Sequence, residues 1–277
     1  MTAPSPSRVE PVAGAGALGM KLLVISLAVL FASAIASFWV VRGNVGNWTG
    51  ATEGFTVPLG VWLGTGLLAL LSLAMSRRML GAGLALALLF LATQVWNWSE
   101  LIAAHLPPGA ASLYAFNFYL LTGLHAAHVL GGLAFHLAVL RRIRREGAAP
   151  AAGDGPRNLA TYWHFLGATW LALVATLVIG ADPTLTAEGI AAAFTWLAGA
   201  AAAVFGLCWL RTEAALLRSE GAAAALVGLF PPLAFLRAFM KADELGLRGW
   251  LFWWTAAFGV ALTAGSIAVA VTMSAAA

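Results

Sequence analysis

The sequence is poor in charge and contains a single cysteine. Charged residues make up 9% of its 277 positions and apolar residues 61%, a balance far from that of a soluble protein. Cys208 has no second cysteine to pair with, so an internal disulfide and the paired thiolates of a copper site are both excluded. Plausibly spaced Ser-His-Asp or Cys-His sets and a nucleotide-binding glycine loop are also lacking. These absences argue against a soluble protein and against nucleophilic catalysis.

The sequence contains long apolar runs. Several exceed eighteen residues, enough to cross a hydrocarbon core of about 30 Å. We expect helices at 20–41, 57–76, 80–104, 112–140, 158–180, 188–210 and 250–273. The sequence thus predicts an all-α polytopic transmembrane helix bundle with about seven spans. Residues 1–19, rich in Pro, Ala, Gly and Ser, predict a disordered tail, and we expect no removable signal peptide.

The basic residues are distributed unevenly over the predicted loops. If the N-terminus, 77–79, 141–157 and 211–249 share one side, that side holds 14 of the 15 basic residues, and Arg42 lies opposite. This bias predicts a cytoplasmic N-terminus and an external C-terminus. The cluster from Arg141 to Arg145 is first a topology determinant, and it could also hold anionic lipid head groups.

Residues 212–249 are apolar but broken. We expect Pro231-Pro232 to end any helix there. We interpret the segment as amphipathic or re-entrant at the cytoplasmic face, with an extra hairpin through the membrane as the weaker alternative.

Histidines gather in the apolar run from Tyr114 to Leu140. At about 100° per residue, His125, His128, Gly132 and His136 fall within roughly 80° of one another. Gly123, Ala127 and Gly131 form a small-residue stripe on the other side, which predicts close approach of another helix. An imidazole in hydrocarbon is unfavourable without a partner, so each histidine is a candidate functional residue.

Haem ligation and metal ligation are the functional interpretations of these histidines. A b-type haem needs axial histidines from two helices at one depth, and His136 and His164 lie at similar predicted depths. His125 and His128 have no histidine opposite them and no visible third ligand. We therefore favour structural histidines, with a haem on His136 and His164 as a weaker alternative.

Glu100 is the one carboxylate within an apolar run, near the outer end of its predicted helix. We expect it to be an interfacial group bonded to Trp98 or water, because no chain of buried acids continues from it as a proton relay would require. Gln94 and Asn97, about a turn deeper, are expected to satisfy each other and neighbouring helices.

Two of these segments carry a family pattern. FNFYLLTGLHAAHVLGGL, then a basic loop and YWHFLGATW, resembles subunit III of the haem–copper oxidases, and QVWNWSEL resembles that family's Gln-x-x-x-Trp segment. The resemblance covers about residues 20–182, in the five-span bacterial form, and leaves 183–277 as an extension with two further membrane helices. The matching residues include Gln94, Trp98, Thr122, Gly123, His125, His128, Gly132, Tyr162, Trp163, His164 and Trp170.

The resemblance implies a non-catalytic subunit of the bacterial inner membrane. With the charge bias described above, we then expect a periplasmic C-terminus. Such subunits carry no cofactor of their own, since haem and copper belong to the catalytic subunit against which they pack. They hold phospholipids and support proton uptake and aerobic electron transport. The matching residues and Glu100 are then expected to contact lipid, neighbouring helices or the partner.

Three carboxylates expected from the family are replaced, by Leu27, Arg157 and Gly167. A proton-entry role is weakened by these departures, which suggest a divergent paralogue. An accessory protein of a nitric oxide reductase is therefore the second hypothesis. A stand-alone b-type cytochrome or a transporter is the third.

Overall fold

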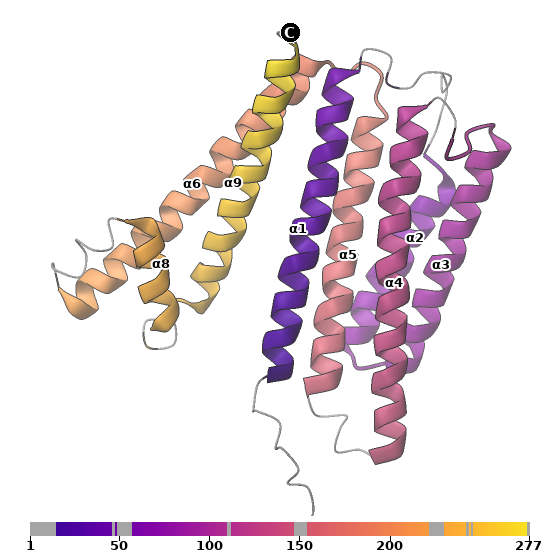
Figure 1. Ribbon diagram of the computed structural model, residues 1–277. Helices are drawn as coiled ribbons and strands as arrows, with labels where there is room; N and C mark the ends of the chain where they lie inside the picture. The colour runs from indigo at the N-terminus through magenta and orange to yellow at the C-terminus, as the bar shows by residue number, and fades with distance from the viewer. Residues whose placement is uncertain are drawn as a thin grey trace, which may run out of the picture. The chain divides into compact units, whose positions relative to one another are not determined.

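The computed structural model describes residues 15–45, 48, 57–109, 112–146, 154–221, 230–241, 244 and 246–275. Most of these residues are helical, and none of them is in a strand (Figure 1). The helices are α1 (Ala15–Asn44), α2 (Leu59–Ser76), α3 (Leu80–Ala103), α4 (Leu113–Glu146), α5 (Asp154–Gly180), α6 (Ala187–Glu220), α8 (Pro231–Met240) and α9 (Arg248–Ala275). Among the described residues, seven helices are long and apolar enough to span a membrane, all but α8. The predicted all-α polytopic bundle is confirmed.

Several helices are longer than predicted. α4 continues to Glu146 and α6 to Glu220, because Arg, Glu and Leu are good helix formers and the backbone stays helical beyond the apolar run. Arg142 and Glu146 also form an i,i+4 ion pair of 3.0 Å at the end of α4. α1 begins at Ala15, so part of the predicted disordered tail is helical, and residues 1–14 lie outside the described residues.

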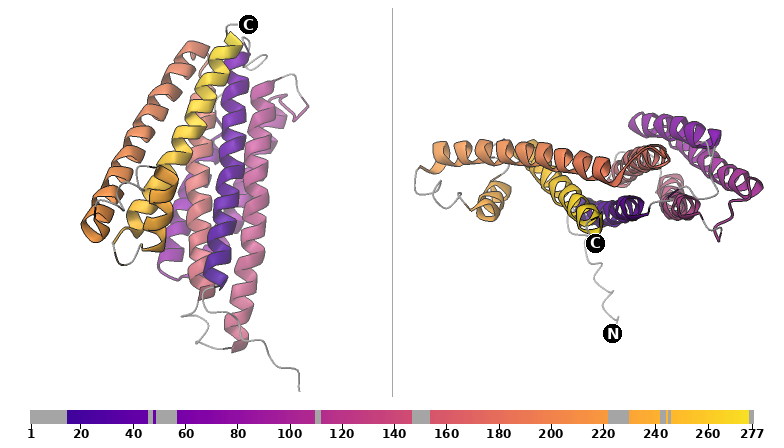
Figure 2. Two further views of the ribbon diagram at one scale, coloured as in Figure 1. Left: turned by 60° about the vertical axis from the view of Figure 1, so that its left-hand side comes forward. Right: turned by 90° about the horizontal axis from the view of Figure 1, so that it is seen from above.

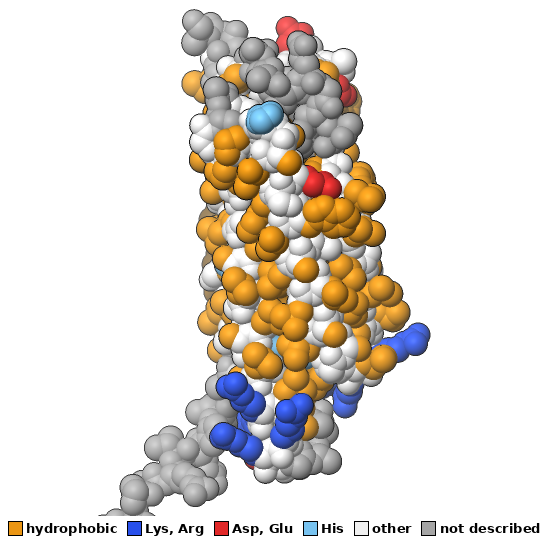
Figure 3. Space-filling view, turned by 90° about the vertical axis from the view of Figure 1, so that its right-hand side faces the viewer, with side chains coloured by type: hydrophobic (Ala, Val, Ile, Leu, Met, Phe, Trp, Pro, Cys, Tyr) orange, Lys and Arg blue, Asp and Glu red, His pale blue; other side chains and the backbone are white. Residues whose placement is uncertain are grey.

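The chain divides into two compact units, residues 1–35 with 47–183 and residues 36–46 with 184–277. In the first unit α2 packs against α3 and α5, and α4 packs against the same two helices, so α2 to α5 close a ring. Gly60 and Gly64 of α2 permit the close approach to α3, since a Cβ on Gly60 would collide with the Asn97 carboxamide. One face of the molecule shows a broad apolar band with Lys and Arg gathered at one end (Figure 3).

The second unit pairs α6 with α9 and adds α8 beside them, as the further views also show (Figure 2). Its buried core comprises Cys208, Ala215, Ala234, Ala238, Leu247, Leu251 and Trp254. The last turns of α1 contribute Trp39, whose ring meets Phe194 edge-on at 5.3 Å, and Arg42, which donates to the Leu185 carbonyl at 3.0 Å.

Pro231 and Pro232 begin α8, a helix that the sequence did not predict, and the predicted end of a preceding helix falls on residues 222–229. Proline is tolerated in the first turn, where its missing N–H is not needed. The α8 helix has ten residues and is too short to span, so the described residues lend no support to an extra hairpin. Residues 222–229 lie outside the described part of the chain.

Candidate functional site

His125 of α4 lies at the centre of the first unit. Its side chain is fully buried, and its ring is faced by Phe90 of α3 at 5.5 Å, Trp170 of α5 at 5.1 Å and Phe31 of α1 at 6.0 Å between centroids. The indole N–H of Trp170 donates to Thr65 Oγ1 of α2 at 3.0 Å. All five helices therefore meet in one group, here called the imidazole cluster: Phe31, Thr65, Phe90, His125 and Trp170.

The ring nitrogens of His125 have no hydrogen-bond partner among the described residues. Leaving a buried polar group unpaired costs about 1–3 kcal/mol. The partner that the sequence led us to expect is thus not found within the described part of this chain, and ring packing holds the imidazole in place.

His128 is half-buried and lies one turn from His125. Its Nδ1 donates to the Leu124 carbonyl at 2.8 Å, and its ring meets Phe31 edge-on at 5.1 Å. Its own carbonyl accepts a hydrogen bond of 2.9 Å from the Tyr162 hydroxyl of α5. His128 therefore fastens both α1 and α5 to α4.

Gly132 lets α5 approach α4 most closely. A Cβ there would lie 2.8 Å from Tyr162 Cε1 and 3.1 Å from the Trp163 ring. The fully buried Trp163 donates its indole N–H to His136 Nδ1 at 3.2 Å. Because Nδ1 accepts, a neutral His136 carries its proton on Nε2.

That tautomer is the opposite of what haem ligation requires. A ligating histidine donates from its other ring nitrogen and offers a bare nitrogen to the metal. His164 is directed elsewhere, since its Nδ1 lies 2.6 Å from Ser72 Oγ of α2. Trp163 and His164 are adjacent on α5, about 100° apart, and therefore contact different helices. The hypothesis of a shared haem on His136 and His164 finds no support in this geometry.

No group of three or more His, Cys, Asp or Glu side chains among the described residues is arranged to hold a metal ion.

Trp98 joins α3 to α4 near the C-terminal end of α3. Its indole N–H donates to Thr122 Oγ1 of α4 at 3.0 Å, and its carbonyl accepts from the Tyr119 hydroxyl at 3.3 Å. An indole has one N–H, so Trp98 does not hold Glu100, and of the two expected partners, Trp98 and water, the first is excluded. Glu100 itself is partly exposed.

Gln94 and Asn97 are buried between α3 and α2 but do not satisfy each other. Gln94 Nε2 reaches Thr93 Oγ1 at 3.3 Å, whereas Gln94 Oε1 and both polar atoms of Asn97 have no partner among the described residues. This prediction was wrong because Gly60 and Gly64 bring an apolar helix surface against them.

The small-residue stripe is left uncovered by the described helices. Ala127 and Gly131 are exposed, and a Cβ on Gly123 would reach Trp98 at 4.0 Å.

Four residues of the site were not predicted from the sequence: Phe31, Thr65, Phe90 and Ser72. The apolar runs in which they lie do not indicate which face of the helix is buried. The two serines of α2, four residues apart at Ser72 and Ser76, were the one available signal.

These features define a multi-pass α-helical membrane domain whose indoles, phenols and imidazoles join its helices. Residues 67–180 match the family model for cytochrome c oxidase subunit III. This stretch of the chain is therefore similar to cytochrome c oxidase subunit III, and most of the residues described above lie within it.

Curated relatives show the same similarity. The chain is 32% identical over 101 residues to cytochrome c oxidase subunit 3 of Corynebacterium diphtheriae, covering 36% of this chain and 49% of that protein. It is 36% identical over 95 residues to cytochrome c oxidase subunit 3 of Synechocystis, covering 34% and 39%. It is 28% identical over 168 residues to cytochrome bo(3) ubiquinol oxidase subunit 3 of Pseudomonas putida, covering 56% and 80%. The chain spans half or less of the length of the first two.

Proposed function

We propose that the chain is a non-catalytic membrane subunit of a respiratory haem–copper oxidase. It would stabilise the catalytic subunit and support aerobic electron transport and proton uptake. The observation that carries the proposal is the engagement of His125, His128 and His136 with rings and backbone of their own bundle. Side chains used in this way serve as scaffold, which suits a subunit whose haem and copper reside in its partner.

The contact surface of this subunit follows from the same helix. The stripe of Gly123, Ala127 and Gly131 faces away from the described bundle, and small residues at this spacing let a foreign helix approach closely. We assign this stripe to the catalytic subunit or to tightly held phospholipid. Gln94, Trp98, Glu100 and Thr122 lie toward the outer end of the same bundle and support that surface.

The domain and topology assignments belong to this proposal. Residues 20–182 would form the subunit III-like domain, preceded by a cytoplasmic tail at 1–19 and followed by the extension at 183–277. The gathering of basic side chains at one end of the bundle supports a bacterial inner-membrane protein with a cytoplasmic N-terminus and a periplasmic C-terminus (Figure 3).

A nitric oxide reductase is the second candidate partner. It is favoured by the three replaced carboxylates: Leu27 is buried, Arg157 is exposed, and no atom lies within 4 Å of a Cβ built on Gly167. A subunit without these acids has lost groups that proton entry to an oxidase would use. The b-type cytochrome on His136 and His164 is the weakest candidate, for the tautomer reason given above.

Affinity purification of the tagged full chain from its native membranes in a mild detergent tests the proposal. We expect a catalytic subunit with haem and copper to co-purify and the complex to consume oxygen. A partner that reduces nitric oxide and not oxygen would replace the first candidate by the second. Recovery of the chain without any metalloprotein would contradict both.

A further inference from the structure

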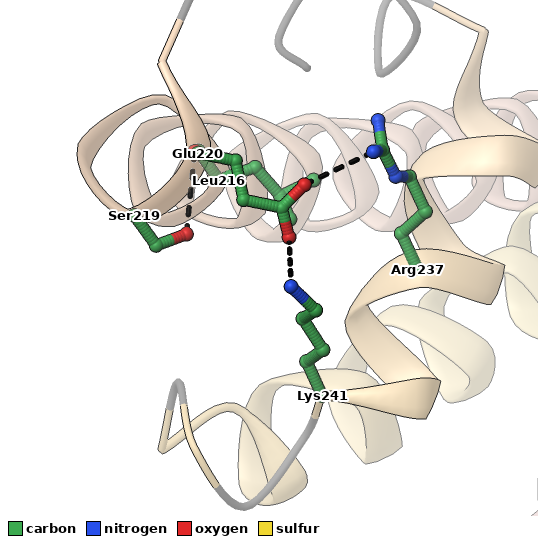
Figure 4. A network of polar contacts seen from close by, with 5 residues as sticks. All are labelled: Leu216, Ser219, Glu220, Arg237 and Lys241. Carbon is green, nitrogen blue, oxygen red and sulfur yellow. Dashed lines mark hydrogen bonds and ion pairs between the residues drawn. The ribbon is translucent and has the colours of Figure 1, made fainter.

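The ten-residue helix α8 runs alongside the C-terminal half of α6. At its basic end, Glu220 of α6 bonds Arg237 at 3.0 Å and Lys241 at 2.5 Å (Figure 4). At its other end, Pro231 and Pro232 line a cavity together with Phe205 of α6. Phe205 precedes Glu220 by fifteen residues, about 22 Å of helix at 1.5 Å per residue. The α8 helix therefore extends from the level of Glu220 back toward the middle of α6.

The positions of the charged residues on α6 and α9 place this end of α8 below the membrane interface. Phe205 is six residues, about 9 Å, from Arg211, the first charged residue at that end of α6. Trp254 and Phe258 of α9, which line the same cavity, follow Arg248 by about 9–15 Å of helix. The cavity is thus placed at the depth of the upper part of a lipid acyl chain, beneath its head group.

The start of α8 is suited to hydrocarbon. Pro231 and Pro232 carry no N–H, and the next N–H, that of Leu233, donates to the Phe230 carbonyl at 3.0 Å. Few backbone donors are left for water to satisfy, which is the requirement for a helix end within a membrane. The exposed side chains of α8 are also apolar over most of its length: Leu233, Leu236, Phe239 and Met240.

The cavity at this end is a half-open groove of about 480 Å³, a size typical of ligand sites. Its lining comprises Phe205, Pro231, Pro232, Phe235, Trp254, Thr255 and Phe258. The rings support one another, since Trp254 meets Phe205 edge-on at 5.6 Å and Phe235 at 5.4 Å. The groove is therefore built from packed aromatic side chains of three helices.

The lining discriminates among membrane occupants. A partner helix would dock on small residues that let backbones approach, and this groove presents rings and prolines instead. A quinone head carries two carbonyls that accept hydrogen bonds, whereas the lining offers one donor, the indole N–H of Trp254, because the hydroxyl of Thr255 donates to the Leu251 carbonyl at 2.9 Å. A hydrocarbon chain requires neither. We propose that the groove holds an acyl chain of a membrane phospholipid, a lipid site in the extension outside the region similar to subunit III.

The test uses the full chain in vesicles of phosphatidylethanolamine and phosphatidylglycerol. These contain a trace of phosphatidylcholine with a photoreactive diazirine in the upper half of one acyl chain. After irradiation, we expect adducts on peptides carrying Phe205, Phe235 or Phe258, above the level on the lipid-exposed Val269 of α9.

Thr255→Trp fills the groove from its edge and should abolish these adducts. Val260→Trp is the matched control, because Val260 is exposed on the same helix and does not line the groove, and it should leave labelling unchanged. Helix content measured by circular dichroism verifies that both variants are folded. Uniform labelling along α9, persistence of the adducts in Thr255→Trp, or their displacement by a long-tailed quinone would overturn the proposal.

Discussion

The two units of this chain are held together by different forces. In the first, aromatic side chains reach across helices to specific polar partners: Trp98 to Thr122, Trp163 to His136, and Trp170 to Thr65. In the second, alanines and rings form much of the core, and two ion pairs of Glu220, with Arg237 and with Lys241, close one end. Apolar packing alone does not distinguish protein from lipid in a bilayer, so hydrogen bonds and close-fitting small residues set the arrangement of helices. Specific hydrogen bonds therefore fix the helix arrangement of the first unit, whereas the core of the second unit depends on the fit of its side chains.

Loss of a ring from the imidazole cluster should have the largest effect. Trp170→Ala removes a fully buried side chain and its bond to Thr65, and we expect a loss of about 3–5 kcal/mol. The measurement is thermal unfolding of the full chain in detergent, followed by size-exclusion chromatography. Trp196→Ala, at an 81% exposed position of the second unit, is the control and should unfold like the parent chain. Equal losses for both variants would remove the contrast between the units.

A methyl group added between α4 and α5 should have the second-largest effect. In Gly132→Ala the added Cβ meets Tyr162 at 2.8 Å, and over-packing of this kind costs about 1–3 kcal/mol. Gly131→Ala adds the same atom one residue away, where it meets Tyr162 at an ordinary 3.7 Å. The same unfolding assay should find Gly132→Ala destabilised and Gly131→Ala unchanged or stabilised, and a reversed order would refute the proposed close approach.

Trp163→Phe should have a smaller effect. It keeps a ring in place but removes the donor to His136, and hydrogen bonds between membrane helices are worth about 0.6–1.7 kcal/mol. A double-mutant cycle with His136→Phe measures the coupling between the two side chains. Additive losses would indicate that the hydrogen bond contributes nothing.

The two ion pairs of Glu220 in the second unit should contribute least, since their charges are partly exposed and screened by salt. We expect Glu220→Gln to lower the unfolding temperature slightly at low ionic strength and to have no effect at high ionic strength. A salt-independent loss larger than that of Trp163→Phe would contradict this ranking.

The spans could be predicted from the sequence because each apolar run is long and is bounded by charge. The clustering of His125, His128 and Gly132 toward one side of α4 also followed from spacing alone. The hydrogen-bond partners could not be predicted in this way. Ser72 meets His164 and Thr122 meets Trp98 only at one rotation of each helix about its axis. Uniformly apolar runs leave that rotation unspecified. The start of α8 at Pro231 was missed because proline at a helix start and proline after a helix end look alike in one sequence.

In the proposed function, the imidazoles of the first unit hold helices together, and the redox groups reside in a partner subunit. The direct test is an absorption spectrum of the isolated full chain, oxidised and then reduced with dithionite. We predict no Soret band in either state and no change on His136→Ala or His164→Ala. A Soret band that either substitution removes would contradict the account.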